Sequence, residues 1–64
     1  MANLDAAQLS SLATSLDDLV KRVTALAETF QGSPREDVAA DLYDVERHLQ
    51  GAHRRMQKLV IKLS

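Results

Sequence analysis

The chain has 64 residues, of which 45% are hydrophobic and 27% charged, and its formal net charge at pH 7 is −1. That length allows one domain at most, and apolar residues that are chiefly Leu, Val and Ala allow only a thin core, which typically needs oligomerisation. The absence of Cys excludes disulfides, zinc ribbons and thiol chemistry, and the near-neutral charge selects neither acidic nor basic partners.

The first predicted element is an amphipathic helix over about residues 4–30. Its apolar residues recur at alternating intervals of three and four, which is the heptad pattern of a coiled-coil seam. The seam residues are Leu9, Leu12, Leu16, Leu19, Val23, Leu26 and Phe30. Asn3 or Asp5 is expected to cap the start of this helix.

The second predicted element is a tight turn over residues 31–34. Gly32 suits the left-handed position that ends a helix. Ser33 and Glu36 have the spacing of a capping box, and Pro34 suits the first turn of the helix that follows. These residues predict a break between two helices rather than one continuous rod.

The third predicted element is a helix over about residues 34–63 with the same apolar spacing. Its seam residues are Val38, Leu42, Val45, Leu49, Ala52, Met56, Leu59 and Leu63. When the chain folds back, the two seams pair in register, with paired residue numbers that sum to 68. The predicted fold class is therefore all-α: residues 1–64 form a single two-helix antiparallel coiled-coil hairpin, expected to dimerise into a four-helix bundle. Gly51 is interpreted either as a tolerated surface residue or as a kink or close approach by a partner.

A row of mostly small residues lies beside each seam, and we expect the isolated hairpin to leave it exposed. Alanine in such a row lets another helix approach closely, so a second copy is expected to cover it, with a heteromeric helix as the alternative. The predicted oligomer interface consists of Ala6, Ala13, Val20, Ala27, Ala39, Glu46, His53 and Val60.

The second helix is acidic in its first half and basic in its second half. This order complements the helix dipole, but it also permits phosphate binding or pairing between antiparallel protomers. The predicted contacts to a partner or to phosphates are Arg47, Arg54, Arg55, Lys58, Lys62 and Ile61. Ile61 is included because it adds apolar surface at the open end of the hairpin.

The two histidines are the remaining candidates for chemistry. His53 shares its row with Glu46 and is interpreted as a bundle-edge histidine, with a pH-sensitive or metal-assisted interface as the alternative. A third hypothesis is a small-ligand or nucleotide sensor, with a site between protomers built from Arg22, His48 and Arg55. Since no nucleophile with a supporting base, glycine-rich phosphate loop or metal-ligand cluster is present, we expect no enzyme activity and no cofactor.

In length and layout the chain resembles the Rop family of plasmid-encoded RNA-binding proteins, whose hairpin dimerises into a four-helix bundle. The resemblance covers the hairpin layout and no shared motif. RNA binding in that family uses a polar and basic face of the first helix, where this chain has only Lys21 and Arg22. Short bacterial coiled-coil regulators, such as anti-sigma hairpins and division-site adaptors, share the same architecture.

These patterns predict a non-enzymatic interaction module that acts as a homo-oligomeric adaptor or regulator by binding another protein. A nucleic-acid-binding bundle that uses the basic half of the second helix is the alternative. No apolar run approaches the ~18–20 residues that cross a bilayer. The N-terminus lacks the basic-then-apolar order of a secretory signal, so we expect a cytoplasmic location.

Overall fold

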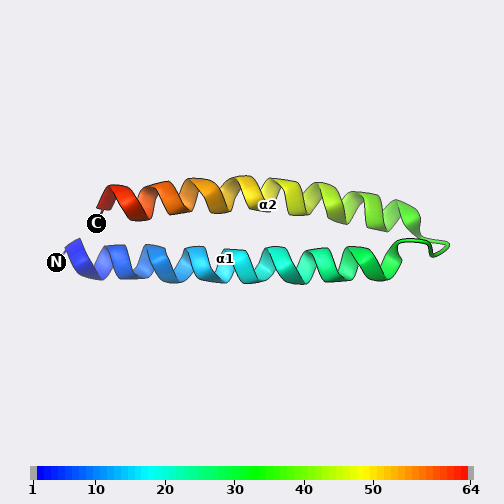
Figure 1. Ribbon diagram of the computed structural model, residues 1–64, viewed down its shortest axis with the longest axis horizontal. Helices are drawn as coiled ribbons and strands as arrows, with labels where there is room; N and C mark the ends of the chain where they lie inside the picture. Colours follow the sequence, from blue (N-terminus) through cyan, green and yellow to red (C-terminus); the bar gives the residue numbers. More distant parts are fainter. Residues whose placement is uncertain (1, 64) are drawn as a thin grey trace.

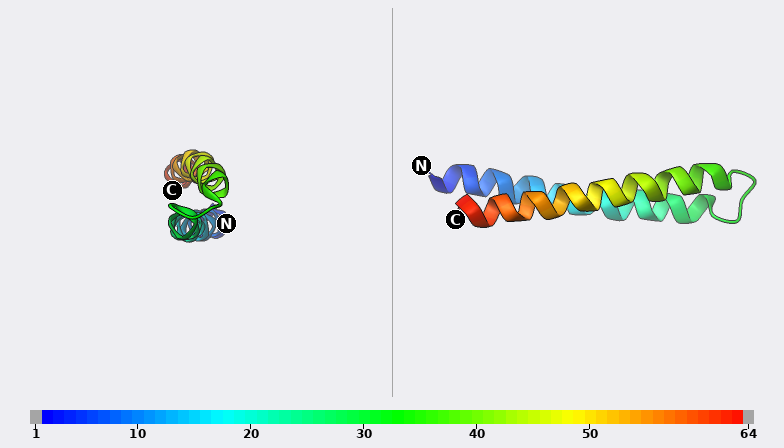
Figure 2. Two further views of the ribbon diagram at one scale, coloured as in Figure 1. Left: turned by 90° about the vertical axis from the view of Figure 1, so that its right-hand side faces the viewer. Right: turned by 90° about the horizontal axis from the view of Figure 1, so that it is seen from above.

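The computed structural model describes residues 2–63 as two antiparallel helices joined by a turn. Helix α1 (Ala2–Phe30) and helix α2 (Glu36–Leu63) lie side by side, with both chain ends at the same end of the hairpin (Figure 1). The end-on view shows a single layer of two helices (Figure 2), and the principal extents are 52 × 14 × 9 Å. The predicted all-α hairpin is thereby confirmed. Because α1 begins at Ala2, Asn3 and Asp5 lie inside the helix and do not precede it as caps.

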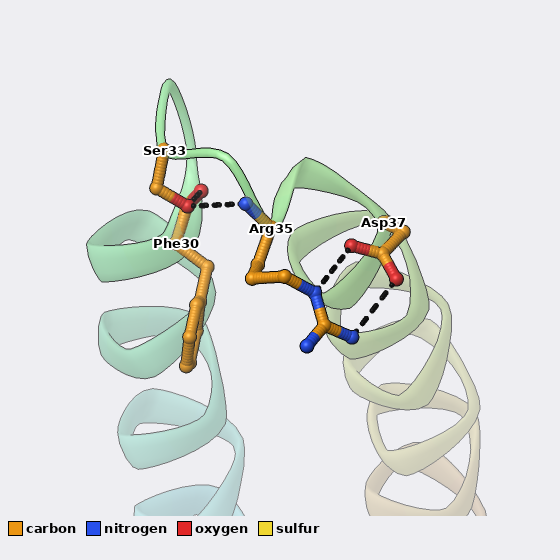
Figure 3. A network of polar contacts seen from close by, with 4 residues as sticks. All are labelled: Phe30, Ser33, Arg35 and Asp37. Atoms are coloured by element: carbon orange, nitrogen blue, oxygen red, sulfur yellow. Dashed lines mark hydrogen bonds and ion pairs between the residues drawn. The ribbon is translucent and has the colours of Figure 1, made fainter.

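The turn is held by side chains that satisfy backbone groups at the helix ends. Gly32 has a φ of +78°, which confirms the predicted left-handed position. Ser33 Oγ donates to the Phe30 carbonyl at 2.6 Å and accepts from the Arg35 N–H at 3.0 Å (Figure 3). Glu36 Oε1 accepts from the Gly32 N–H at 3.1 Å, one residue before the Ser33 N–H that a capping box would use. Helix α2 begins at Glu36, two residues after the expected start.

An exposed ion pair follows the turn at the start of α2. Arg35 Nε and Nη2 each lie 3.1 Å from a different carboxylate oxygen of Asp37, so the contact is bidentate (Figure 3). The guanidinium lowers the pKa of Asp37, and the carboxylate raises the pKa of Arg35. The pair sits at the N-terminus of α2, where the helix dipole favours a negative charge.

The two helices bury two rows of residues from each helix against one another, and we call these rows the inner seam. In α1 the inner seam consists of Ala6, Leu9, Ala13, Leu16, Val20, Val23, Ala27 and Phe30. In α2 it consists of Ala39, Leu42, Glu46, Leu49, His53, Met56 and Val60. Ala27 is fully buried at 0% exposure, Ala13, Val20 and Ala39 are also buried, and the others are half-buried.

The observed seam differs from the predicted one by a rotation of each helix through roughly 50°, because one of its two rows moves by one residue and successive residues of an α-helix are 100° apart. The rows that contain Ala13 and Ala39 were expected to stay exposed on the hairpin, and that expectation is wrong because each row packs against the other helix. Leu12, Leu19 and Leu26 were expected in the seam, yet they are 57%, 41% and 49% exposed. Ala13, Ala27 and Ala39 face inward, where their small side chains permit a close approach of the two helices.

One side of the inner seam is lined by polar residues, which we call the polar flank. Its members are Ser10, Asp17, Thr24, Gln31, Tyr43, Gln50 and Gln57. Thr24 Oγ1 donates to Glu46 Oε2 at 2.5 Å, and Tyr43 OH donates to Gln31 Oε1 at 3.0 Å. The first of these bonds places residues 24 and 46 side by side. The numbers of these two paired residues sum to 70, whereas the predicted pairing has a sum of 68.

Candidate interaction surface

The other side of the inner seam is lined by apolar residues from both helices, which we call the apolar face. Its members are Leu12, Leu19 and Leu26 from α1 and Val45, Ala52 and Leu59 from α2. Each is exposed, and the two from α2 with large side chains, Val45 and Leu59, are 45% and 44% exposed. On each helix the members recur every seven residues, so they form a straight row parallel to the seam.

A shallow groove shows that the two apolar rows belong to one surface. Leu12, Leu16 and Leu19 of α1 line it together with Met56 of α2. Met56 also lines the neighbouring groove that contains Ala52 and Leu59. The apolar face is therefore continuous across both helices, and it lies on the opposite side of the hairpin from the Thr24–Glu46 and Tyr43–Gln31 hydrogen bonds.

The structure assigns the predicted oligomer interface to the inside of the hairpin. The eight residues of that prediction are Ala6, Ala13, Val20, Ala27, Ala39, Glu46, His53 and Val60, and each of them is buried or half-buried against the other helix. The surface that remains uncovered is the apolar face. It consists of one of the two rows that the sequence predicted for the seam of each helix. The signal that could have identified it is the width of the apolar stripe on α1, where three heptad positions are apolar and a single hairpin interface needs two.

Polar side chains border the apolar face on its outer edge. On α2 these are Asp41, His48, Arg55 and Lys62, each exposed and seven residues from the next. On α1 the corresponding row borders the apolar face in the same way, and its charged member is Arg22. The rim of α2 thus changes from acidic near the turn to basic near the C-terminal end.

Asp44 organises the polar groups near the middle of α2. Its carboxylate accepts from Arg47 Nη2 at 2.5 Å and lies 3.8 Å from His48 Nδ1, and its backbone carbonyl lies 2.8 Å from the same His48 nitrogen. All these side chains are exposed, so the contacts are worth little to stability. Among residues 2–63 no group of three or more His, Asp or Glu side chains is placed to hold a metal ion.

The predicted basic contacts form a cluster along α2. Arg47, Arg54, Arg55 and Lys58 line one shallow groove beside Gly51. Lys62 joins Arg55 and Lys58 in a second groove toward the C-terminal end. Ile61 is 73% exposed and lines a different groove, on the side of the polar flank, with His53 and Asp17.

A Cβ atom added at Gly51 would meet one atom within 4 Å, Arg54 Nη2 at 3.9 Å, which is an ordinary contact. The hairpin itself therefore does not require glycine at this position.

His53 is half-buried in the inner seam, so the hairpin encloses it without a second protomer.

Neither described helix is long and apolar enough to cross a membrane. In comparisons with known proteins, no family model matches the chain, and no curated protein or solved structure is significantly similar to it.

Proposed function

We propose that this chain is a small helical protein–protein interaction module that acts as a homo-oligomeric adaptor or regulator. The observation that carries the proposal is the continuous apolar face, whose leucines on α1 are at least 41% exposed. Contiguous exposed apolar surface with a polar rim is typical of interaction sites on soluble proteins. A layer only 9 Å thick also encloses little apolar area, so a partner that covers this face adds the burial the hairpin lacks.

The geometry of the face favours helices as its partner. Its two rows run parallel to α1 and α2, so two further helices laid along them complete a four-helix bundle. The outer surfaces of both helices remain free in such an assembly. They carry most of the charged residues, which suits contacts with a second protein.

The adaptor role is tested by affinity capture from the native cell with chemical cross-linking and mass spectrometry. Wild type is compared with Leu12→Lys/Leu26→Lys, which introduces charge on the apolar face, and with Ala25→Lys, which does so at an exposed position outside it. We expect wild type and Ala25→Lys to capture the same protein and the double variant to lose it. Capture of the chain alone by wild type, or equal capture by all three, contradicts the adaptor role.

Nucleic-acid binding is the second candidate, and the basic groove on α2 favours it. Arg47, Arg54, Arg55 and Lys58 present four cations along one side of a helix, as phosphate contacts require. The single tyrosine, Tyr43, is half-buried and bonded to Gln31 on the polar flank, so it offers no stacking platform beside these cations.

This candidate is tested by electrophoretic retention of single- and double-stranded DNA and RNA at low salt. Binding should weaken steeply as salt rises, and Arg54→Gln/Lys58→Gln should reduce both the affinity and the salt slope. Lys21→Gln, which removes one charge from the outer side of α1, serves as the control. The absence of retention at low salt excludes the candidate.

A further inference from the structure

We infer that the apolar face is covered by a second copy of this chain in the opposite orientation, so that the two turns lie at opposite ends of the dimer. The inference rests on the proposed interaction module and specifies its first partner. A twofold axis would pass between the copies at the level of Leu19 and Ala52. There α1 would pack on the partner's α1, and α2 on the partner's α2.

The apolar face has the symmetry that such a dimer requires. The two hydrogen bonds between the helices, Thr24–Glu46 and Tyr43–Gln31, join residues whose numbers sum to 70 and 74. The level of Leu19 therefore lies between residues 51 and 55 of α2, a range that includes Ala52. Leu12 and Leu26 are each seven residues from Leu19, and Val45 and Leu59 are each seven residues from Ala52. A twofold rotation at this level therefore superposes each apolar row on itself, which is the condition for an isologous interface.

Charge determines the orientation, because the net charges of the two halves of the hairpin have opposite signs. The half with the chain ends, residues 1–19 and 52–64, holds four basic and three acidic residues. The half with the turn, residues 20–51, holds six acidic and four basic residues. The opposite orientation brings halves of unlike charge together, whereas a dimer with both turns at one end brings like halves together.

The rim of the apolar face supports the same orientation. Asp41 lies eleven residues before Ala52, and Lys62 lies ten residues after it. A twofold axis at Ala52 thus places Asp41 of one copy opposite Lys62 of the other, and the pair occurs twice in the dimer. In the alternative orientation, His48 and Arg22 of different copies approach each other and Asp41 gains no basic residue.

Cysteine cross-linking separates the two orientations, because the chain has no Cys of its own. In the proposed dimer Ala52 faces Ala52 of the partner, so Ala52→Cys should form a disulfide-linked dimer under mild oxidation. Gln50→Cys, exposed on the polar flank, should form no disulfide-linked dimer under the same conditions. Leu19→Cys supplies a second site on the axis, and circular dichroism checks that each variant is helical.

The result that overturns the orientation is equally specific. If Ala52→Cys and Leu19→Cys proteins link only when they are mixed, α1 packs on the partner's α2 and both turns lie at one end. If sedimentation shows a monomer at micromolar concentration, no self-association occurs, although capture of another protein would still uphold the interaction module. A dimer that captures nothing would instead overturn the adaptor role alone.

Charge reversal tests the rim pair independently of cysteine. Asp41→Lys should weaken dimerisation up to about tenfold by placing two lysines opposite each other twice in the dimer. Adding Lys62→Asp should restore the affinity of the wild type. Asp18→Lys, an exposed change on α1 away from the face, controls for the altered net charge. Additive effects of Asp41→Lys and Lys62→Asp would contradict the pairing.

Discussion

The turn illustrates how single residues fix the architecture. Ser33 and Glu36 satisfy backbone groups that the two helix ends leave without intrahelical partners. Gly32 supplies the positive φ that reverses the chain. Each of these residues could be identified from the sequence, since their types are typical of helix boundaries. The bidentate Arg35–Asp37 pair could not, because a spacing of two residues gives no reliable side-chain contact.

Replacing Gly32 with alanine should destabilise the hairpin. Its φ of +78° lies in the left-handed region, which an L-residue with a Cβ atom occupies at a free-energy cost of roughly 1–2 kcal/mol. No atom lies within 4 Å of the added Cβ, so the effect would come from backbone strain rather than from a clash. Urea unfolding followed by circular dichroism measures it. Gly51→Ala, in the interior of α2, should have the opposite sign, with a gain of up to about 1 kcal/mol.

The Arg35–Asp37 pair should be lost in acid. Arg35 holds the pKa of Asp37 below its ordinary value. The contribution of the pair to stability is therefore present above the unfolded pKa of about 3.9 and is lost as the pH falls through the lower, folded pKa. Arg35→Gln should raise the pKa of Asp37, as followed by NMR titration of its carboxyl carbon. Lys58→Gln, near the other end of α2, should leave the titration of Asp37 unchanged, and an equal shift in both variants would contradict the assignment.

At the scale of the helices, the sequence predicts two amphipathic elements and their antiparallel arrangement, but not which side of each stripe faces inward. On α1 the rows that contain Leu9, Leu12 and Ala13 are all apolar, so two different pairs of rows satisfy a heptad pattern. Local spacing is the same for both choices. The choice depends on how closely the backbones approach and on whether the polar flank can form its Thr24–Glu46 bond, which are properties of the packed pair.

Enlarging Ala27 should test the observed seam directly. Ala27 is 0% exposed, so Ala27→Leu inserts a larger side chain at the most buried position of the interface and should destabilise the hairpin by about 1–3 kcal/mol. Ala25→Leu, two residues earlier at an exposed position, should change stability by less than about 0.5 kcal/mol. Denaturant unfolding of the two variants measures the difference. If Ala27→Leu were neutral, the alanine row would face outward, as the heptad pattern alone predicts.

At the scale of the whole molecule, the two-helix hairpin corresponds in form to one half of a four-helix bundle. The buried residues of its inner seam are three alanines and a valine, and four of its leucines lie on the apolar face. Folding and association are then linked, because a partner that binds only the folded hairpin stabilises it by mass action. The sequence predicts the need for such a partner from its thin core, but the surface that we propose for the partner could be identified only once the rotation of the helices is known.

This linkage predicts that the melting temperature rises with protein concentration. Leu19→Lys should abolish that dependence and lower the melting temperature by roughly 10 °C, since the loss of a buried leucine is worth about 2 kcal/mol and each kcal/mol shifts a domain of this size by about 4–8 °C. In an isolated hairpin Leu19 is 41% exposed, so its replacement would cost about half as much, roughly 1 kcal/mol, and would do so at every protein concentration. Thermal unfolding over a hundredfold range of concentration, with Ala25→Lys as the matched surface control, distinguishes the two cases. A melting temperature that is independent of concentration in the wild type, as in Leu19→Lys, would show that the apolar face stays uncovered.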